Sequence, residues 1–436
     1  MDFSDLLQSV NSIEEKYPPV HLWNPDLCEG VEMKIDREGN WFYQNSIIGR
    51  DKLKILFSRI LKLEDGKYFL VTPVEKVPVT VDLAPYMIVD YEIDSDFQNL
   101  ILKTKVNKND IEDVIIGCAF PEGEQGFNIG KIVTFLSDMN VKTAGTTVNR
   151  WCGSSMEAIH IAAGKISMGA GKAFICGGVE SMSRVTTGLN PLPYPKSNTE
   201  NPHLYFTMGT TAENVAKKYL IDRRSQQEFA ISSHQKAHEA QTKGNFKNEI
   251  TEIYGCSIDG GIRASSNHEV LDNLNLIFDK NGTVTAATSS PLTDGAATTL
   301  VCEEQYARDN NLEILGRIIS TAVEGCDPDY MGLGPIGASR KALKRANLSI
   351  KDIDIIELNE AFASQSLACI KDLEIDINKV NLDGGAISLG HPLGATGARI
   401  TGKAAELLVR ENKKFALATQ CIGYGMGIAT IIEAVN

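Results

Sequence analysis

The apolar and polar positions of the chain change their pattern near residue 108. Before it, apolar residues occur in short runs that glycine, proline and Asp-Gly pairs interrupt, at residues 41–43, 67–72 and 87–91. Runs of this length and punctuation are typical of β-strands, and a short amphipathic helix is expected before them at about residues 4–15. We therefore predict a small β-rich module over residues 1–107.

The module carries four aromatic residues close together in sequence: Trp23, Trp41, Phe42 and Tyr43. They either form the core of the module or line a binding face, and the pattern leaves both interpretations open. Two segments, Lys16–Trp23 and Ile35–Trp41, resemble a small uncharacterised bacterial family with a mostly β fold. That resemblance implies no known activity.

After residue 108, apolar strands alternate with helical periodicity, as in an α/β protein. A strand at 110–117 comes first, and the helix after residue 152 leads to a strand at 173–176. A second set follows the same order: a glycine-rich turn, a helix ending near residue 410 and a strand at 415–419. This repetition predicts an internal duplication, in which two α/β halves pack together and their turns meet at a pseudo-twofold axis.

One cysteine lies where an extended segment becomes a helix. In Val148–Gly164, Cys152 precedes Gly153 and two serines, which supply a turn and a cap, and helical spacing begins at Met156. The positive end of the helix dipole favours the thiolate, so Cys152 is a candidate nucleophile. The alternative is a buried structural cysteine beside a helix cap.

Three further motifs carry polar side chains. Gly384–Arg399 is glycine-rich and contains His391 in a Gly-His-Pro sequence. Cys421–Gly427 is a second glycine-rich turn, and Asn359–Ala363 has the sequence Asn-Glu-Ala-Phe-Ala. Glycines let a backbone approach a ligand closely, so His391 and Cys421 are expected to face one shared cavity. Together with Cys152, these motifs in this order resemble the thiolase family over roughly residues 108–436.

The resemblance implies a thiolase-like duplicated fold of the α/β class with five layers, αβαβα. We expect the N-terminal half at 108–304, with a loop domain at about 185–285, and the C-terminal half at 305–436. In the family a first strand and helix precede this start, and here the β-rich module stands in their place. The N-terminal half is therefore expected to be truncated. Loss of an interior strand would leave backbone groups unpaired. Two explanations stay open: the gene is truncated or fused, or residues 50–107 supply a substitute strand.

The resemblance also implies roles in cleaving a 3-ketoacyl-CoA. Cys152 would attack the ketone carbon and keep the shortened acyl group as a thioester, while His391 takes the thiol proton. Cys421 would protonate the departing acetyl-CoA enolate and then activate coenzyme A. Oxyanion donors would be His391 with a water held by Asn359, and the backbone N–H groups of Cys152 and Gly423.

Each of these roles has a structural alternative. His391 and Cys421 could be core residues, and Asn359 could cap a helix that starts at Ala361. Glu360 is interpreted as orienting a loop rather than transferring protons.

Three residues match family positions near coenzyme A. Ser290 and Met208 correspond to residues that contact the pantetheine, and Arg263 lies where some members place an arginine near the nucleotide. The alternatives are a core position for Met208 and a solvated surface position for Arg263. The family implies coenzyme A as a substrate, no tightly bound cofactor and no metal.

Composition narrows the class of partners. The formal net charge of −13 argues against a nucleic-acid binder. Nine scattered cysteines indicate neither a disulfide framework nor a zinc site, and favour a reducing cytoplasm. No apolar run approaches the roughly 18 residues of a membrane span. We expect a cytoplasmic homodimer or homotetramer that acts on acyl-CoA and CoA, with other β-oxidation enzymes as further partners.

Three features resemble the degradative members of the family: Thr207 in place of a histidine, Tyr424 within the last glycine motif and the run Thr288–Ser290. We therefore expect cleavage of 3-ketoacyl-CoA in fatty-acid β-oxidation, the reaction of an acetyl-CoA C-acyltransferase. An acetyl-CoA C-acetyltransferase and a non-catalytic thiolase-like fusion protein are the alternatives. A β-ketoacyl synthase uses two histidines with its cysteine, so Cys421 argues against that class.

Overall fold

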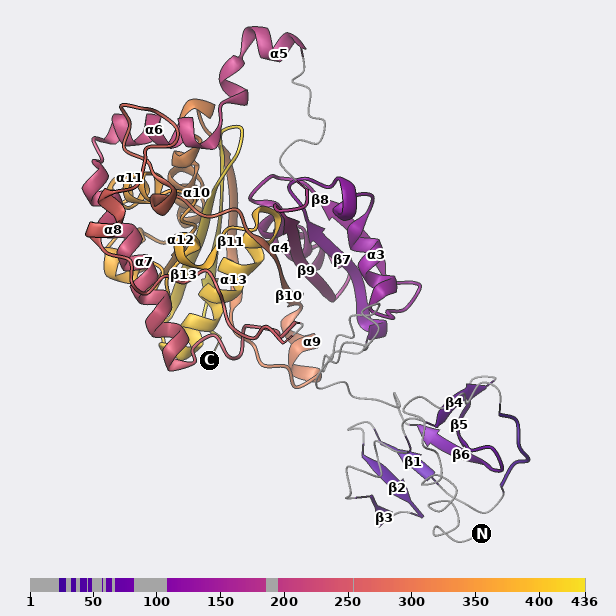
Figure 1. The fold of residues 1–436 in the computed structure, drawn as a ribbon. Helices are drawn as coiled ribbons and strands as arrows, with labels where there is room; N and C mark the ends of the chain where they lie inside the picture. The colour runs from indigo at the N-terminus through magenta and orange to yellow at the C-terminus, as the bar shows by residue number, and fades with distance from the viewer. Residues whose placement is uncertain are drawn as a thin grey trace. The chain divides into compact units, whose positions relative to one another are not determined.

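A computed structural model describes residues 23–28, 33–36, 40–44, 46–48, 57, 60–64, 67–81, 108–185, 195–253 and 255–435. The chain divides into two compact units, residues 1–107 and 108–436 (Figure 1). Each unit has its own sheets and its own core, so each is described separately.

The first unit contains a six-stranded sheet in the order β3-β2-β1-β6-β5-β4. Its strands are β1 (Met33–Ile35), β2 (Trp41–Tyr43), β3 (Ser46–Ile47), β4 (Leu61–Glu64), β5 (Lys67–Val71) and β6 (Lys76–Val81). The strands expected at 41–43 and 67–72 are therefore confirmed. The helix expected at 4–15 and the strand at 87–91 lie outside the described residues.

The aromatic residues of this unit contribute to its core. Trp41 is 4% exposed and its ring centroid lies 6.0 Å from that of the buried Phe57. Trp23 and Tyr43 are partly buried and pack against the same cluster. The core interpretation is therefore the one these contacts support.

The second unit begins with a four-stranded sheet in the order β10-β9-β7-β8. The strands are β7 (Ile111–Gly117), β8 (Ala144–Val148), β9 (Ala173–Ser181) and β10 (Asp294–Cys302). β7 pairs in parallel with β8 and β9, and β10 pairs antiparallel to β9. α3 (Ile129–Leu136) packs on β7 and β8, and α4 (Ser154–Ser167) packs on β7 and β9.

The C-terminal half repeats this arrangement with the order β11-β14-β13-β12. Its strands are β11 (Arg317–Gly325), β12 (Ile355–Leu358), β13 (Phe415–Ile422) and β14 (Met426–Glu433). Its main helices are α10 (Gly334–Ala346), α11 (Ala363–Asp372), α12 (Ala386–Leu389) and α13 (Leu393–Arg410). β12 pairs in parallel with β13 and with an isolated bridge at Val380, and β14 is antiparallel to β13. In the N-terminal half β7 likewise pairs in parallel with β8 and β9, and β10 is antiparallel to β9. β12, β13 and β14 therefore correspond to β7, β9 and β10, which confirms the predicted duplication.

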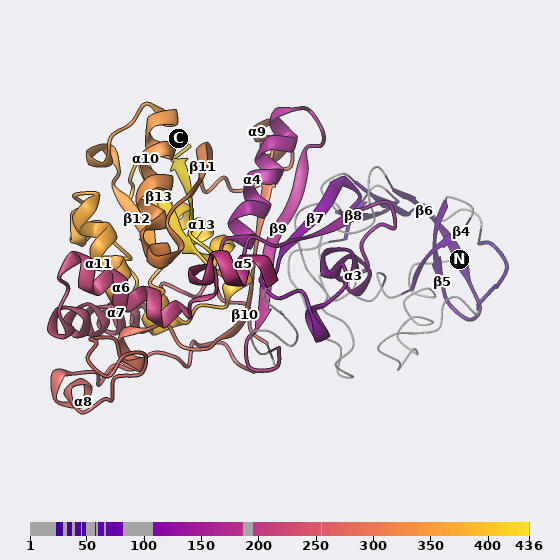
Figure 2. The same cartoon turned by 90° about the horizontal axis from the view of Figure 1, so that it is seen from above.

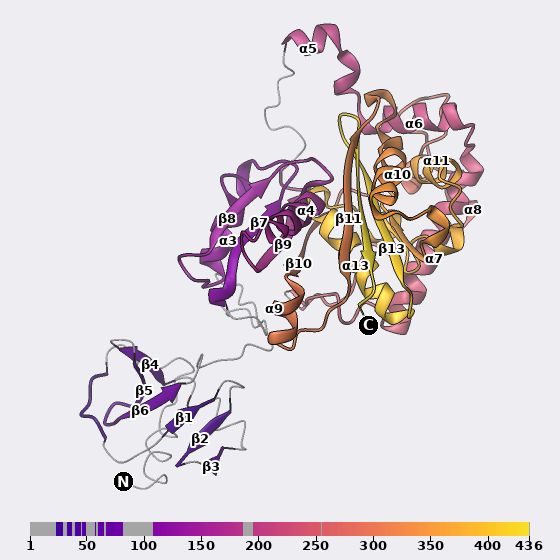
Figure 3. The same ribbon diagram turned by 180° about the vertical axis from the view of Figure 1, so that it is seen from behind.

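Five layers result from this duplication. α4 and α13 pack on each other between the two sheets, α3 covers the outer face of one sheet and α10 covers the outer face of the other (Figures 2 and 3). A Cβ on Gly397 of α13 would lie 2.4 Å from the backbone nitrogen of Met156 on α4, so the helices cross where only hydrogen fits. At the same crossing Ser155 Oγ accepts the backbone N–H of Ala398 at 2.8 Å.

The two halves differ at one edge. In the C-terminal half the first strand, β11, pairs with β14 at the edge of the sheet. Within described residues 108–302 no strand occupies the equivalent position beside β10, along which exposed and half-buried residues alternate until Val301. A strand at this position would be an edge strand, as β11 is, and the four described strands of the N-terminal half pair without it. The truncation itself stays a prediction.

A long helical insertion separates β9 from β10. It holds α5 (Pro195–Glu200), α6 (Met208–Tyr219), α7 (Arg223–Lys243) and α8 (His268–Asp272). α6 packs on α11 and on the turn at Pro328–Leu333, and α7 packs on α11 and α12, so these two helices lie on the C-terminal half. α9 (Glu304–Asp309) joins the halves after β10.

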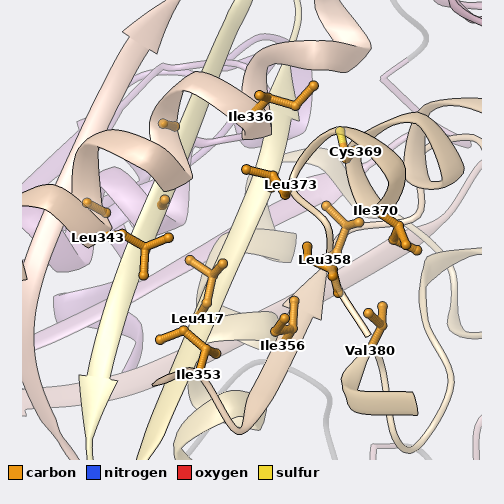
Figure 4. Packing of buried hydrophobic residues seen from close by; sticks show 14 of the residues in the cluster. Ile336, Leu343, Ile353, Ile356, Leu358, Cys369, Ile370, Leu373, Val380 and Leu417 are labelled. Carbon is orange, nitrogen blue, oxygen red and sulfur yellow. The ribbon is translucent and has the colours of Figure 1, made fainter. Parts of the chain in front are cut away.

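The largest core cluster of the second unit lies between the C-terminal sheet and its outer helices. Ile336 and Leu343 of α10 pack there with Ile356 of β12 and Leu417 of β13 (Figure 4). This packing holds the strands whose carboxyl ends lead into the candidate site.

Candidate active site

Cys152 lies on a tight turn between β8 and α4. Trp151 adopts a positive φ of 46°, and Gly153 is the N-cap of α4. Ser154 closes the turn, because its Oγ accepts the N–H of Arg150 at 2.9 Å and donates to the carbonyl of Trp151. The predicted turn is confirmed, although the serines lie inside the helix rather than capping it. The Cys152 side chain is left half-buried.

The electrostatics of Cys152 differ from the expectation. Burial, together with the smaller effect of the negative charge of Glu180, raises the pKa of its thiol to about 11. A hydrogen bond from the backbone N–H of Gly423 acts in the opposite direction and is weaker than the effect of burial. The helix dipole favours the thiolate of Cys152, but burial opposes it more strongly, so the pKa of this thiol lies above its ordinary value.

Cys421 is the next-to-last residue of β13, just before the hairpin turn that leads into β14. It is 1% exposed, and burial raises the pKa of its thiol well above the ordinary value, with the charge of Cys152 as the second cause. The two thiols are therefore close enough to interact. Gln420 adds a direct link, because its side-chain amide donates to the carbonyl of Cys152.

His391 lies between α12 and α13 and is 4% exposed. Its backbone N–H donates to Thr293 Oγ1 at 3.0 Å, its Nδ1 lies 2.6 Å from Thr396 Oγ1, and its Nε2 lies 3.3 Å from Asn359 Nδ2. Burial lowers the pKa of the ring to about 3, with the positive charge of Arg399 as a second cause. The imidazole is therefore neutral at pH 7.

Asn359 directly follows β12 and is 1% exposed. The helix after it, α11, begins at Ala363 with Phe362 as its N-cap, so the alternative in which Asn359 caps this helix is wrong. Its Oδ1 is buried and has no protein partner, which leaves one acceptor free for a ligand or a water.

Glu360 fastens the segment before His391. One carboxylate oxygen accepts the N–H of Ile387 at 3.1 Å and the hydroxyl of Ser233 at 2.6 Å, while the other accepts Asn381 Nδ2 at 2.8 Å. Burial raises the pKa of this carboxyl group. These contacts agree with the interpretation that Glu360 orients a loop.

Glu180 is an organising residue that our sequence analysis missed. It lies on β9, is 1% exposed and accepts the backbone N–H groups of Ala119 and Gly394, each at 2.8 Å. Gln125 donates to the same carboxylate. Because Gly394 belongs to the first turn of α13, Glu180 connects the N-terminal half to the helix that follows His391. The available signal was the charged residue in an otherwise apolar strand, Ala173–Ser181.

Comparisons with known proteins agree with this geometry. Residues 94–305 match the thiolase N-terminal domain and residues 312–434 match the thiolase C-terminal domain. The chain belongs to the thiolase family. The first match begins ahead of the start expected at residue 108, in a segment outside the described residues. Residues 18–84 match the N-terminal domain of a domain of unknown function, DUF1285, so the first module is a different small family, as predicted.

Curated relatives cover most of the thiolase part. A 3-ketoacyl-CoA thiolase of Shewanella loihica is 48% identical over 347 residues, which are 77% of this chain and 90% of the relative. A 3-ketoacyl-CoA thiolase of Vibrio parahaemolyticus is 45% identical over 342 residues, 76% of this chain and 88% of the relative. In the part of this thiolase that the structure describes, no helix is both long and apolar enough to span a bilayer.

The three residues expected near coenzyme A lie at different distances from this centre. Met208, the first residue of α6, packs on the cluster that contains Cys421, and its sulfur lies 4.0 Å from where a Cβ on Gly423 would be. The N–H of Ser290 donates to the carbonyl of Ala361 at 3.0 Å. Arg263 is exposed, and its N–H donates to His234 Nδ1 of α7. The structure thus places Met208 and Ser290 beside the thiolase motifs and leaves Arg263 at the surface of the insertion.

One acidic cluster within the described residues has ligand-like spacing, Glu249, Asp383 and Glu406, whose oxygens lie within 4.8 Å of one another. Lys403 Nζ lies 2.5 Å from both Glu249 and Asp383, and Arg410 is 2.6 Å from Asp383. Cations of the chain already neutralise this cluster, so it is an ion-pair network rather than a candidate metal centre.

Proposed function

We propose that this thiolase cleaves 3-ketoacyl-CoA with coenzyme A, giving acetyl-CoA and an acyl-CoA shortened by two carbons. The observation that carries the proposal is the convergence of both cysteine turns: the N–H of Gly423 bonds to the sulfur of Cys152, and the side-chain amide of Gln420, next to Cys421, donates to the carbonyl of Cys152. The names of the curated relatives support the same reaction.

The first half-reaction needs a base, because the thiol of Cys152 has a pKa of about 11 and is protonated at neutral pH. His391 is neutral and can accept this proton as the sulfur forms a bond to the ketone carbon of the substrate. The bond between the second and third carbons then breaks. Its electron pair leaves as the acetyl-CoA enolate, and the Cys421 thiol gives that enolate a proton.

The second half-reaction reverses these roles. The Cys421 thiolate takes the thiol proton of coenzyme A, whose sulfur attacks the acyl group held on Cys152, and the Cys152 thiolate that leaves regains its proton from His391. Backbone N–H groups of Cys152 and Gly423 stabilise one oxyanion, and His391 with a water on the free oxygen of Asn359 stabilises the other. Met208 and Ser290 contact the pantetheine, and Arg263 lies near the nucleotide end.

Purified full-length protein should cleave acetoacetyl-CoA and a longer 3-ketoacyl-CoA when coenzyme A is added. Acetoacetyl-CoA should give two acetyl-CoA, and the longer substrate should give acetyl-CoA and the shortened acyl-CoA in equal amounts. The variant Cys152→Ala should lose this activity. Substrate without coenzyme A should leave an acyl group on the Cys152 peptide, detected by mass spectrometry. Preference for the longer substrate is the expected result, whereas cleavage restricted to acetoacetyl-CoA would favour an acetyl-CoA C-acetyltransferase.

A folded protein that gives neither turnover nor acyl-enzyme would overturn the proposal and favour the non-catalytic alternative. Light scattering on the same sample tests the expected homodimer or homotetramer.

A further inference from the structure

The two ring nitrogens of His391 have one protein partner each. Nδ1 lies 2.6 Å from Oγ1 of Thr396, and Nε2 lies 3.3 Å from Nδ2 of Asn359. All three residues are buried, with Thr396 0% and Asn359 1% exposed. The protons on these atoms are therefore set by the three side chains and by the carbonyl groups they contact.

Thr396 has a single hydroxyl proton, and the structure contains a carbonyl group that can accept it. Its Oγ1 donates to the carbonyl of Pro392 at 3.0 Å, and a carbonyl can only accept. The hydroxyl oxygen then meets Nδ1 with a lone pair, so Nδ1 must carry the proton of the ring. On the other side, the amide nitrogen of Asn359 can only donate, so Nε2 must accept. Both conditions select the same neutral tautomer.

The position of the Thr396 hydroxyl is fixed by α13 itself. The carbonyl of Pro392, the N-cap of this helix, accepts the backbone N–H of Thr396 at 3.0 Å as well as its hydroxyl. A threonine in a helix commonly bonds to the carbonyl four residues before it, and its branched side chain leaves few alternative rotamers. The first turn of α13 thus presents a fixed acceptor to the histidine that precedes it.

We propose that Thr396 is a positioning residue that holds His391 in the Nδ1–H tautomer and so keeps the lone pair on Nε2, which would exchange the Asn359 N–H for the proton of the Cys152 thiol. This inference rests on the function proposed above. The ring gains a proton on Nε2 during the reaction and keeps its Nδ1–H bond to Thr396 throughout, so it can return the proton without rotating. In the other tautomer Nε2 would already carry a proton, so it could not accept the proton of the Cys152 thiol and the ring could not act as the base.

The competing arrangement is specific. If the amide of Asn359 were rotated, its oxygen would face Nε2, the ring proton would move to that nitrogen, and the Thr396 hydroxyl would have to turn from Pro392 to Nδ1. The tautomer of the wild-type ring separates the two arrangements without any variant.

The first experiment is nitrogen NMR of protein labelled with ¹⁵N-histidine. The chain has seven histidines, and the variant His391→Gln identifies the signals of His391 by their loss. At pH 7 the expected spectrum shows a protonated Nδ1 and an unprotonated Nε2. A protonated Nε2 in the wild type would overturn the inference, whether or not the protein has thiolase activity.

The second experiment compares Thr396→Val, which lacks the hydroxyl, with Thr396→Ser, which keeps it. In Thr396→Val we expect the ¹⁵N pattern to shift toward the other tautomer and kcat for thiolysis to fall about 100-fold with little change in KM, the lower range for losing a general base. Thr396→Ser should keep the wild-type ¹⁵N pattern and most of kcat. A Thr396→Val protein with wild-type spectrum and turnover would refute the role of Thr396 while leaving the proposed function intact.

Discussion

The carboxylate of Glu180, near the end of β9, accepts the backbone N–H of Gly394, in the first turn of α13, at 2.8 Å. This bond joins the N-terminal half, which carries Cys152, to the C-terminal half, which carries His391. The same charge raises the pKa of Cys152, and His391 lies three residues before Gly394. Glu180 therefore affects both members of the proposed nucleophile and base pair, one through its charge and the other through the backbone.

Replacing Glu180 by Gln should separate these effects. The amide removes the negative charge, so the pKa of Cys152 should fall, and it turns an NH₂ group toward backbone donors, so the fold should lose about 1–3 kcal/mol of stability. The pH dependence of Cys152 alkylation and urea unfolding measure the two results. Glu313→Gln, at an exposed position in the same unit, is the matched control and should change neither. An unchanged Cys152 pKa in a folded Glu180→Gln protein would contradict the charge effect.

The resting state of Cys152 gives a second prediction. A thiol with a pKa of about 11 reacts through a small thiolate fraction, so iodoacetamide labelling of Cys152 should rise about tenfold per pH unit between pH 7 and 10. Peptide mass spectrometry follows the rate at this residue. A plateau reached near pH 7 would instead indicate a preformed ion pair between Cys152 and His391, and the proton transfer proposed above would then precede substrate binding.

At this site the sequence predicts the local turns but not the features that depend on tertiary packing. The turn around Cys152 and the hairpin after Cys421 could be predicted, because glycine, serine and apolar spacing act locally. The ionisation of Cys152 could not, because burial is a property of the packed halves and outweighs the helix dipole. Glu180 was missed for the same reason, since its partners Ala119 and Gly394 are far from it in sequence. Pattern also could not place β11 at a sheet edge, since strand order depends on tertiary pairing.

A buried histidine outside the site gives a third prediction. His160 of α4 contacts Thr430 Oγ1 at 2.8 Å, and burial lowers its pKa to about 3, with the charges of Arg150 and Arg345 as further causes. Glu157 lies 3.9 Å away and favours the charged ring, but less than these effects oppose it. An unfolded histidine has a pKa near 6.5, so below that pH the histidine of the unfolded chain binds a proton while His160 of the folded protein stays neutral.

The stability of the second unit should therefore fall with decreasing pH, beginning near pH 6.5. His160→Gln should reduce this slope by up to about 1.4 kcal/mol per pH unit between pH 6 and 4, because it removes one group that binds a proton only in the unfolded chain. Urea unfolding at several pH values measures the slope, and His238→Gln, at an exposed histidine, should leave it unchanged. An identical slope in His160→Gln and wild type would mean that His160 is charged in the folded protein.

The glycine-rich turn after Cys421 gives a fourth prediction, in which two glycines two residues apart should behave differently. Gly425 has a φ of +81°, and a Cβ there would lie 2.3 Å from the carbonyl oxygen of Cys326, whose N–H bonds to the Gly425 carbonyl at 2.8 Å. A Cβ on Gly423 would meet its nearest neighbours, Trp151 and Met208, only at 3.8 and 4.0 Å, which is ordinary contact. Gly425→Ala should therefore disturb the hairpin that carries Cys421, while Gly423→Ala should fold normally.

The expected cost of Gly425→Ala combines the positive φ with the clash, and exceeds about 1–2 kcal/mol. Urea unfolding should show this loss for Gly425→Ala and a change within about 0.5 kcal/mol for Gly423→Ala. Iodoacetamide labelling of Cys152 should also change in Gly425→Ala, because the displaced turn carries the Gly423 N–H that bonds to its sulfur. Equal stability of the two variants would show that the turn adjusts freely, and the glycines would then be required by the ligand rather than by the backbone.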